Sequence, residues 1–217
     1  MRYPINEIFQ TIQGEGYYTG TPSIFIRLQG CPVHCNWCDT KYTWICDDKD
    51  NVSSKEIINK KQVSKQWSFI TIEEILVILK KWTAKHIVIS GGEPCLYNLL
   101  YITKILETKG YQCQIETSGI KNIICSSNTW ITLSPKKNMK PLNESIIRSN
   151  EIKFPILKQE DLLYVYDILS NIKDTKKRII YLQPISQNKK ALNICIDICI
   201  KQNWKLSVQL HKYIKIQ

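Results

Sequence analysis

The sequence lacks any uninterrupted apolar run of the length that a transmembrane helix requires. Its first residues, MRYPINEIFQ, also lack the basic start followed by an apolar segment that is typical of a secretory signal. We therefore expect a cytoplasmic protein with no membrane contact. Internal repeats and low-complexity linkers are absent too, so we expect one domain spanning residues 1–217, of which 43% are hydrophobic.

Acidic residues are scarce, with 19 Asp and Glu against 30 Lys and Arg, which gives a net charge of +11. A basic surface attracts nucleic acid, anionic small molecules or an acidic protein. The lysines are spread along the chain in KKW, SPKKNMK, DTKKR and NKK rather than gathered in one tract. This spread favours solvated faces over a dedicated nucleic-acid site, and we expect no direct nucleic-acid partner.

Short β-branched or aromatic runs alternate with segments of helical period. We predict strands at 23–29, 86–90, 112–117, 129–134, 151–156, 179–184 and 205–210. Predicted helices follow a T-x-x-E capping box at Thr71 and Glu74, follow Pro94 as far as Gly110, and span 160–172 and 188–203. Such alternation predicts an α/β fold with a mostly parallel sheet. Because six or seven βα units are fewer than a full barrel has, an incomplete (βα)6-type TIM-like barrel fits best.

Residues 41–70 interrupt this rhythm, since they are polar, rich in lysine and ambiguous in period. We interpret them as a variable insert with a short helix near 54–65. They directly follow a cluster of cysteines, and our hypothesis is that they shield it, so that deleting them speeds loss of a bound cofactor in air.

Three cysteines crowd into the ten residues CPVHCNWCDT, with no fourth nearby. Cys31, Cys35 and Cys38 can hold three irons of a 4Fe-4S cluster and leave the fourth iron open for a substrate or cofactor. The alternative is zinc, with His34 or a distant cysteine as the fourth ligand, although His34 lies inside the tight loop. A reducing compartment keeps thiols free, and we expect ordinary burial for the other cysteines: Cys46, Cys95, Cys113, Cys125, Cys195 and Cys199.

Nearly every predicted strand ends in a polar or glycine-bearing motif. The cysteine cluster follows 23–29, GGEP follows 86–90, SG follows 112–117, PKK follows 129–134, and QPIS closes 179–184. Parallel α/β folds bind ligands at this edge. One shared site is therefore predicted there.

Arg27 stands within an apolar strand, between Ile26 and Leu28. A charge in such a place is costly unless it is paired. Two interpretations remain open: a bidentate grip on a substrate carboxylate, or an ion pair with an Asp or Glu of the same chain.

The C-x3-C-x2-C spacing, with Trp37 before its last cysteine and GGEP after a strand, resembles the radical S-adenosylmethionine (SAM) superfamily. Further short motifs narrow the resemblance to the 7-carboxy-7-deazaguanine synthase family. They are QGEG, RLQGCP, CDT, ETSG, LSPK, EIKF, LQPI and VQLHKY. Only residues 41–70 match poorly.

This resemblance implies a homodimeric lyase with a radical SAM core. It would convert 6-carboxy-5,6,7,8-tetrahydropterin to 7-carboxy-7-deazaguanine with loss of ammonia, for queuosine or another 7-deazapurine and so for tRNA modification. Hydrogen abstraction by a 5'-deoxyadenosyl radical and ring contraction would carry the reaction. The implied cofactors are a 4Fe-4S cluster, SAM and Mg²⁺, and an acidic flavodoxin or ferredoxin would suit the basic surface as reductant.

The resemblance also assigns residues to these partners. Thr40 resembles the family's magnesium ligand. SAM contacts are implied for Trp37, Cys38, Asp39, Gly91, Gly92, Glu93, Ser134, Pro135, Lys136 and Gln183. Substrate contacts are implied for Ile12, Gln13, Gly14, Glu15, Gly16, Arg27, Ser90, His211 and Gln217.

Two other classes stay open. A small radical SAM activase that places a glycyl radical on a protein shares the cysteine spacing but needs neither Arg27 nor QGEG. An iron-sulfur electron-transfer or nucleic-acid-binding protein would not need the GGE motif.

Overall fold

The computed structural model describes residues 1–216, apart from the side chain of Ser186. It contains one nine-stranded sheet in the order β3-β1-β2-β4-β5-β6-β7-β8-β9. The strands are β1 (Arg2–Ile12), β2 (Pro22–Leu28), β3 (Ser68–Thr71), β4 (His86–Gly91), β5 (Gln112–Thr117), β6 (Trp130–Leu133), β7 (Glu151–Ile156), β8 (Ile179–Pro184) and β9 (Lys205–Leu206). The α-helices are α1 (Ser54–Ile58), α2 (Ile72–Leu79), α3 (Leu100–Thr108), α4 (Asn143–Arg148), α5 (Asp161–Ser170), α6 (Lys189–Gln202) and α7 (Leu210–Ile214). No helix of residues 1–216 has the length and apolar character needed to cross a membrane.

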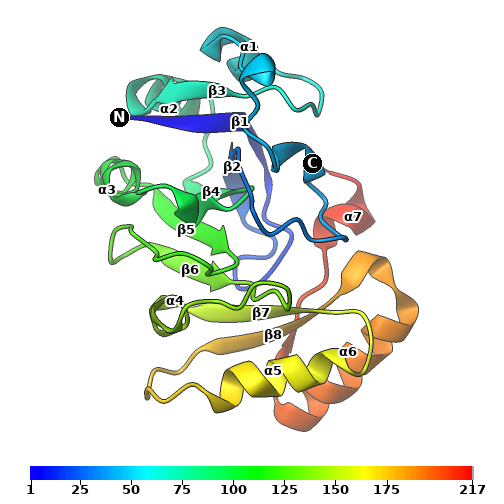
Figure 1. The fold of residues 1–217 in the computed structure, drawn as a ribbon. Coiled ribbons are helices and arrows are strands. Elements are labelled where there is room, and N and C mark those ends of the chain that lie inside the picture. The colour runs from blue at the N-terminus through cyan, green and yellow to red at the C-terminus, as the bar shows by residue number, and fades with distance from the viewer. Residues whose placement is uncertain (217) are drawn as a thin grey trace.

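The sheet confirms the predicted α/β architecture with mostly parallel strands. Each strand pairs in parallel with the next along the series β2, β4, β5, β6, β7, β8 and β9. Strand β1 is antiparallel to both of its neighbours, β2 and β3. Among the described residues no ladder joins β3 to β9, so the barrel is not closed. Figure 1 shows the strands stacked in chain order below β1, with α7 returning toward the loop that joins β1 to β2.

The predicted strands correspond to β2 and to β4 through β9, but two boundaries were wrong. Strand β9 has only two residues, Lys205 and Leu206; residues 207–209 of the predicted strand form a connection, and Leu210 begins α7. The helix predicted near 54–65 stops at Ile58. Strands β1 and β3 and helices α4 and α7 were not predicted.

Local signals fix the helices that were predicted. The Thr71 and Glu74 capping box is formed, with each side chain accepting from the other residue's backbone N–H. Gly110 follows α3 with φ +81°, a conformation that glycine adopts without penalty.

Two apolar clusters cover the outer face of the sheet. One joins β1, β2, β4 and β5 to α1, α2 and α3, and the other joins β7 and β8 to α5 and α6. Cys95, Cys113, Cys195 and Cys199 are buried as expected, and Cys125 is half-buried, whereas the prediction of burial was wrong for Cys46, which is exposed in the loop after the cysteine cluster.

The inner face of the sheet is polar, unlike the outer one. In β7, Ile152, Phe154 and Ile156 pack in the outer cluster while Lys153 and Pro155 face a cavity. Gln114, Thr132 and Glu151, also buried, continue this polar lining below the cavity. Strand alternation therefore places the core outside and the site inside.

Candidate functional site

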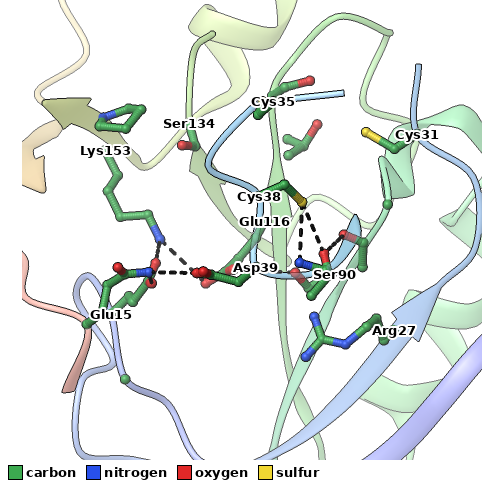
Figure 2. A pocket seen from close by; sticks show the side chains of 18 of the residues that line it. Glu15, Arg27, Cys31, Cys35, Cys38, Asp39, Ser90, Glu116, Ser134 and Lys153 are labelled. Carbon is green, nitrogen blue, oxygen red and sulfur yellow. Dashed lines mark hydrogen bonds and ion pairs between the residues drawn. The ribbon is translucent and has the colours of Figure 1, made fainter. Parts of the chain in front are cut away.

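A cavity of about 280 Å³ lies inside the curved sheet, walled by the C-terminal ends of the parallel strands. Motifs from β2, β4, β5, β6, β7 and β8 all contribute to its lining, and Figure 2 shows several of their side chains turned toward one another. The predicted site residues that line it are Ile12, Gln13, Gly14, Glu15, Arg27, Cys31, Cys35, Trp37, Cys38, Asp39, Thr40, Ser90, Gly91, Gly92, Glu93, Ser134, Lys136, Gln183 and His211. One shared site at this edge is thus what the fold provides.

Two predicted residues are not in this lining, and a third is not described. Gly16 lies below the cavity in a turn with φ +67°, where an added Cβ would be 2.5 Å from Oε1 of Glu151. Pro135 is buried outside the lining. Gln217 lies outside the described residues.

The cysteine loop presents three free thiols to the cavity. Burial raises the pKa of the Cys31 and Cys35 thiols, and the backbone N–H groups of Val33 and His34 partly offset this for Cys31. His34 reaches that position with φ +50°, and its ring stacks on Trp44 with centroids 4.6 Å apart. The His34 ring therefore packs on Trp44, and this contact weighs against a role for His34 as a zinc ligand.

The sulfurs of Cys31, Cys35 and Cys38 line the cavity without converging on one point. Within residues 1–216, no three His, Cys, Asp or Glu side chains converge closely enough to hold a single ion. A cluster of several irons spans more space than one ion, so three separated thiols fit a 4Fe-4S cluster better than zinc. The residues present therefore fit the implied group.

Thr40 and Asp39 follow the last cysteine. The Thr40 hydroxyl lies 3.5 Å from Sγ of Cys38 and 3.4 Å from the carbonyl oxygen of Gly91. Asp39 is half exposed and pairs with Lys212 at 2.9 Å. Thr40 thus faces the cavity between the cysteine loop and β4, and its magnesium role stays a prediction.

The GGE motif is packed directly against the base of the cysteine loop. The N–H of Gly92 donates to Leu28 O at 2.9 Å, and the N–H of Glu93 donates to Gly30 O at 2.7 Å. An added Cβ on Gly92 would lie 2.0 Å from the oxygen of Gly30. These glycines are required for contact between two backbones, which is a structural reason that the sequence interpretation did not include.

Glu93 is only 1% exposed. Its carboxylate accepts from the N–H of Cys95, the hydroxyl of Thr117 and both the N–H and the hydroxyl of Ser118. Glu93 thereby ties the end of β4 to the end of β5, and contact with SAM stays a prediction.

For Arg27 the sequence left two interpretations open, an ion pair within the chain and a contact with a substrate carboxylate. The structure shows the ion pair and is compatible with the substrate contact. Its Nε donates to Glu7 at 2.6 Å, which is the ion pair within the chain. The structure gives Nη1 and Nη2 no hydrogen-bond partner in residues 1–216, and the guanidinium faces the cavity (Figure 2). Glu7 thus orients the side chain while the outer nitrogens remain available to a ligand.

The QGEG loop forms the floor of the cavity. Glu15 and Lys153 form an ion pair, and Gln209 Nε2 donates to Glu15 at 3.0 Å. Burial alone would raise the pKa of the Glu15 carboxyl, but the charge and hydrogen bond of Lys153, with help from Gln209, lower that pKa to about 2. Glu15 is therefore an ionised acceptor.

The C-terminal segment closes one side of the cavity. Leu210 N donates to Gly14 O at 3.0 Å, and the ring of His211 packs where a Cβ on Gly14 would be. Gln209 also bonds Asp39, at 3.1 Å, so this segment links the QGEG loop to the cysteine loop.

The remaining predicted SAM residues, Ser134, Lys136, Gln183 and Trp37, line other parts of the cavity. Lys136 Nζ donates to the Ser134 hydroxyl, and burial lowers the pKa of the Lys136 ammonium. Gln183 accepts from the Ser207 hydroxyl at 2.9 Å. Trp37 lines the cavity beside the cysteines.

Several cavity residues were missed as site candidates. They are Phe9, Phe25, Val33, Trp44, Glu116, Thr117, Ser118, Lys153, Pro155, Ile185, Gln209 and Lys212. Lys153 carried the same signal as Arg27, a charge within an apolar strand, and Glu116 is the penultimate residue of the strand that precedes the SG motif. Phe9 and Phe25 stack across the β1–β2 ladder with centroids 5.4 Å apart and carried no comparable signal.

Comparisons with known proteins agree with this geometry. The sequence model described as "Radical SAM superfamily" matches residues 25–144. The chain is 68% identical to a 7-carboxy-7-deazaguanine synthase of Buchnera aphidicola subsp. Schizaphis graminum, over 100% of both chains. It is 49% identical to the Escherichia coli K12 protein of that name, again over 100% of both. The crystal structure of QueE from Escherichia coli superposes with a TM-score of 0.93 at 49% identity, covering 97% of this chain and 95% of that one.

Proposed function

The chain belongs to the 7-carboxy-7-deazaguanine synthase family of the radical SAM superfamily, and from this we infer that its cavity is the active site of that synthase. It converts 6-carboxy-5,6,7,8-tetrahydropterin to 7-carboxy-7-deazaguanine with loss of ammonia, a carbon–nitrogen lyase reaction in 7-deazapurine and queuosine biosynthesis. One observation carries this assignment to the cavity: Cys31, Cys35, Cys38, the GGE motif and Gln13 to Glu15 of the QGEG loop all line the same cavity.

The 4Fe-4S cluster and SAM of this superfamily supply one-electron reduction and hydrogen abstraction when bound. We propose that Cys31, Cys35 and Cys38 hold the cluster by their thiolates. The N–H of Thr40 donates to Sγ of Cys38 at 3.4 Å, which helps to fix the position of that sulfur. Lys136 and the backbone of Gly91 and Gly92 would bind and orient SAM beside it.

The pterin would lie between the Phe9 and Phe25 side and the QGEG loop. Flat heterocycles stack on aromatic rings, and both rings line the cavity. The outer nitrogens of Arg27 would bind the substrate carboxylate, and the ionised Glu15 would accept from the amino-pyrimidinone edge. The C-terminal segment would cover one side of this position.

Magnesium is proposed at Thr40. Mg²⁺ keeps few protein ligands and completes its octahedron with substrate oxygens and water, so a single hydroxyl facing the cavity suffices. Titrating Mg²⁺ against Thr40→Val tests this assignment, because the variant keeps the side-chain shape and should lose metal-dependent activation.

Three further proposals rest on the family likeness and the composition. We propose a homodimer, to be tested by analytical ultracentrifugation. An acidic flavodoxin or ferredoxin is the proposed reductant, because the chain carries +11 charge. A cytoplasmic location is proposed because all nine cysteines are free thiols.

The deciding experiment is anaerobic. The reconstituted protein is reduced with dithionite, given SAM, Mg²⁺ and 6-carboxytetrahydropterin, and its products are followed by mass spectrometry. We expect 7-carboxy-7-deazaguanine from the wild type and none from Cys31→Ala, Cys35→Ala or Cys38→Ala. Cys46→Ala is the matched control, since Cys46 is exposed and does not line the cavity. Release of 5'-deoxyadenosine without the product would point to another substrate.

A further inference from the structure

Lys153 is a buried cation on the inner face of β7, with a side chain only 5% exposed. Its neighbours along the strand, Ile152 and Phe154, point to the opposite face and pack in the outer core. An ammonium in such a position is costly unless anionic groups surround it. The anionic groups in contact with Lys153 therefore indicate its role.

Two carboxylates of the cavity face Lys153. Glu15 comes from the loop after β1 and forms a direct ion pair with it, while Oε1 of Glu116, at the end of β5, lies 3.9 Å away. Figure 2 shows Lys153 reaching between these two side chains. With one cation for two anions, the trio keeps a net charge of −1 inside the cavity wall.

Both carboxylates retain acceptor capacity toward the cavity. Glu15 accepts from Lys153 and Gln209, and Glu116 accepts from Gln13 at 3.1 Å and Ser90 at 3.4 Å. An ionised carboxylate has about four lone-pair positions, so each has room for a further donor. An amino-pyrimidinone edge offers neighbouring N–H donors of this kind.

We propose that Lys153 is a positioning residue that keeps Glu15 and Glu116 both ionised, so that together they accept hydrogen bonds from the N–H groups of the pterin. The inference rests on the proposed function, because it takes the pterin as the ligand. Without Lys153, two buried carboxylates of like charge would share one site, and one of them would take up a proton. A protonated carboxyl carries an O–H donor, which would face an N–H donor of the pterin. That hydrogen bond would be lost, and the pterin would bind more weakly.

Other charged groups face this trio. Glu151 lies below Lys153 on β7, Lys136 follows β6, and His211 approaches Glu15 from the C-terminal segment. Lys136 is tied to Ser134, and Glu151 accepts from Thr132 at 2.6 Å and from the N–H of Tyr17 at 3.0 Å. Neither is in contact with Glu15 or Glu116, so Lys153 is their direct cationic partner.

Between about pH 5 and 10 the pH dependence of stability should differ with and without Lys153. In the wild type the pKa of Glu15 is lowered to about 2 and that of Lys153 is raised, so the stability they contribute is constant between about pH 5 and 10. In Lys153→Met a carboxyl pKa rises above its ordinary value, and stability is then lost as pH rises through that higher pKa. The deficit of the variant should therefore grow from pH 5.5 to 8.5.

The test uses the reconstituted full-length protein under anaerobic conditions. For Lys153→Met we expect the pterin KM to rise about 10- to 100-fold, with a smaller change in kcat. We also expect that KM to become pH-dependent between about pH 5 and 8. The thermal midpoint, measured in parallel, should fall further below that of the wild type as pH rises.

Two variants make the result specific. In Lys153→Met/Glu15→Gln the like-charge pair is gone, so the pH dependence of both KM and the thermal midpoint should disappear although KM stays high. Lys140→Met removes an exposed lysine from its pair with Asp167 at 3.1 Å and should show neither effect. A Lys153→Met deficit equal at every pH, with KM raised but independent of pH, would overturn the proposal. If the wild type makes no product, the thermal arm still decides the role of Lys153, while the proposed function fails.

Discussion

Replacing Gly92 with alanine perturbs one backbone contact at the centre of the site. The added Cβ would lie 2.0 Å from the oxygen and 2.5 Å from the carbonyl carbon of Gly30. Carbon–oxygen contacts of this kind need at least about 3 Å, so the two loops must separate by about 1 Å. Gly92 does not have a positive φ, so the effect of the substitution is steric and not conformational.

The magnitude follows from the bonds that cross this contact. The donors are the N–H of Gly92 at 2.9 Å from Leu28 O and the N–H of Glu93 at 2.7 Å from Gly30 O. Stretching two buried hydrogen bonds by about 1 Å, with the steric strain added, should cost about 3 kcal/mol. For a chain of this size that corresponds to a fall in the thermal midpoint of about 6–12 °C.

The assay is thermal unfolding together with iron content after reconstitution. Gly92→Ala should lower both, because the displaced Gly30 precedes Cys31 directly. Gly20→Ala is the matched control: its φ of +88° is unfavourable for alanine, but no atom lies within 4 Å of the added Cβ. We expect about 1 kcal/mol of destabilisation there and full iron content. A thermal midpoint within 1 °C of the wild type for Gly92→Ala would refute the reasoning.

Two further predictions concern single contacts. Lys212→Met breaks a pair with Asp39, whose side chain is 51% exposed, so unfolding by denaturant should show a loss below about 1 kcal/mol; a larger loss would mean that this pair holds the C-terminal segment closed. Backbone and side-chain bonds from Thr71 and a bond from Ser54 lower the pKa of Glu74, so its contribution to stability is present above about pH 4.5 and lost as pH falls below it. Glu74→Gln should flatten that part of the stability profile, and an unchanged acid slope would contradict this.

The parallel part of the fold was predictable because apolar runs and helical periods alternate there. Strand β1 was not, since Asn6 and Glu7 interrupt its apolar pattern yet are buried. Asn6 bonds Gln29, Ser64 and Gln66, and Glu7 bonds Arg27 and Tyr42, all at least twenty residues away in sequence, so only tertiary contacts satisfy these buried polar groups. The same reason applies to β9, where Ser207 ends the strand by bonding Gly16 and Gln183.

The site was predictable where its residues form local motifs and not where strand register assembles it. Cys31, Cys35 and Cys38 are recognisable from their spacing alone. The trio of Glu15, Glu116 and Lys153 spans three elements, and although single residues carry local signals, only the assembled strands show that these three side chains meet. For Arg27, the rule that a buried charge needs a partner predicted both a substrate grip and an ion pair, and Nε and the outer nitrogens can divide those roles.

The segment 41–70 can be tested more sharply than by deleting it whole. Its first part holds the cysteine loop directly, because Gly30 N donates to Thr43 O at 2.7 Å and Cys31 N to Trp44 O at 2.9 Å. Its last part contributes β3 to the sheet. Residues 53–66 form a loop between these two parts, and its ends lie together because Val52 N donates to Trp67 O at 2.9 Å.

Replacing residues 54–65 with Asn-Gly should therefore leave the sheet intact while removing Lys60. The Lys60 ammonium donates to Asn6, Ser64 and Gln66, and Asn6 in turn bonds Gln29, which donates to the backbone at Tyr42 and Ile45, directly after the cysteine loop. We expect faster loss of iron in air, with Lys60→Met giving part of the effect and Lys61→Met none. Because Ile57 also leaves the core, the thermal midpoint must fall as well. A lower midpoint with unchanged iron loss would mean that 54–65 only stabilises the fold, and the shielding hypothesis would then be dismissed.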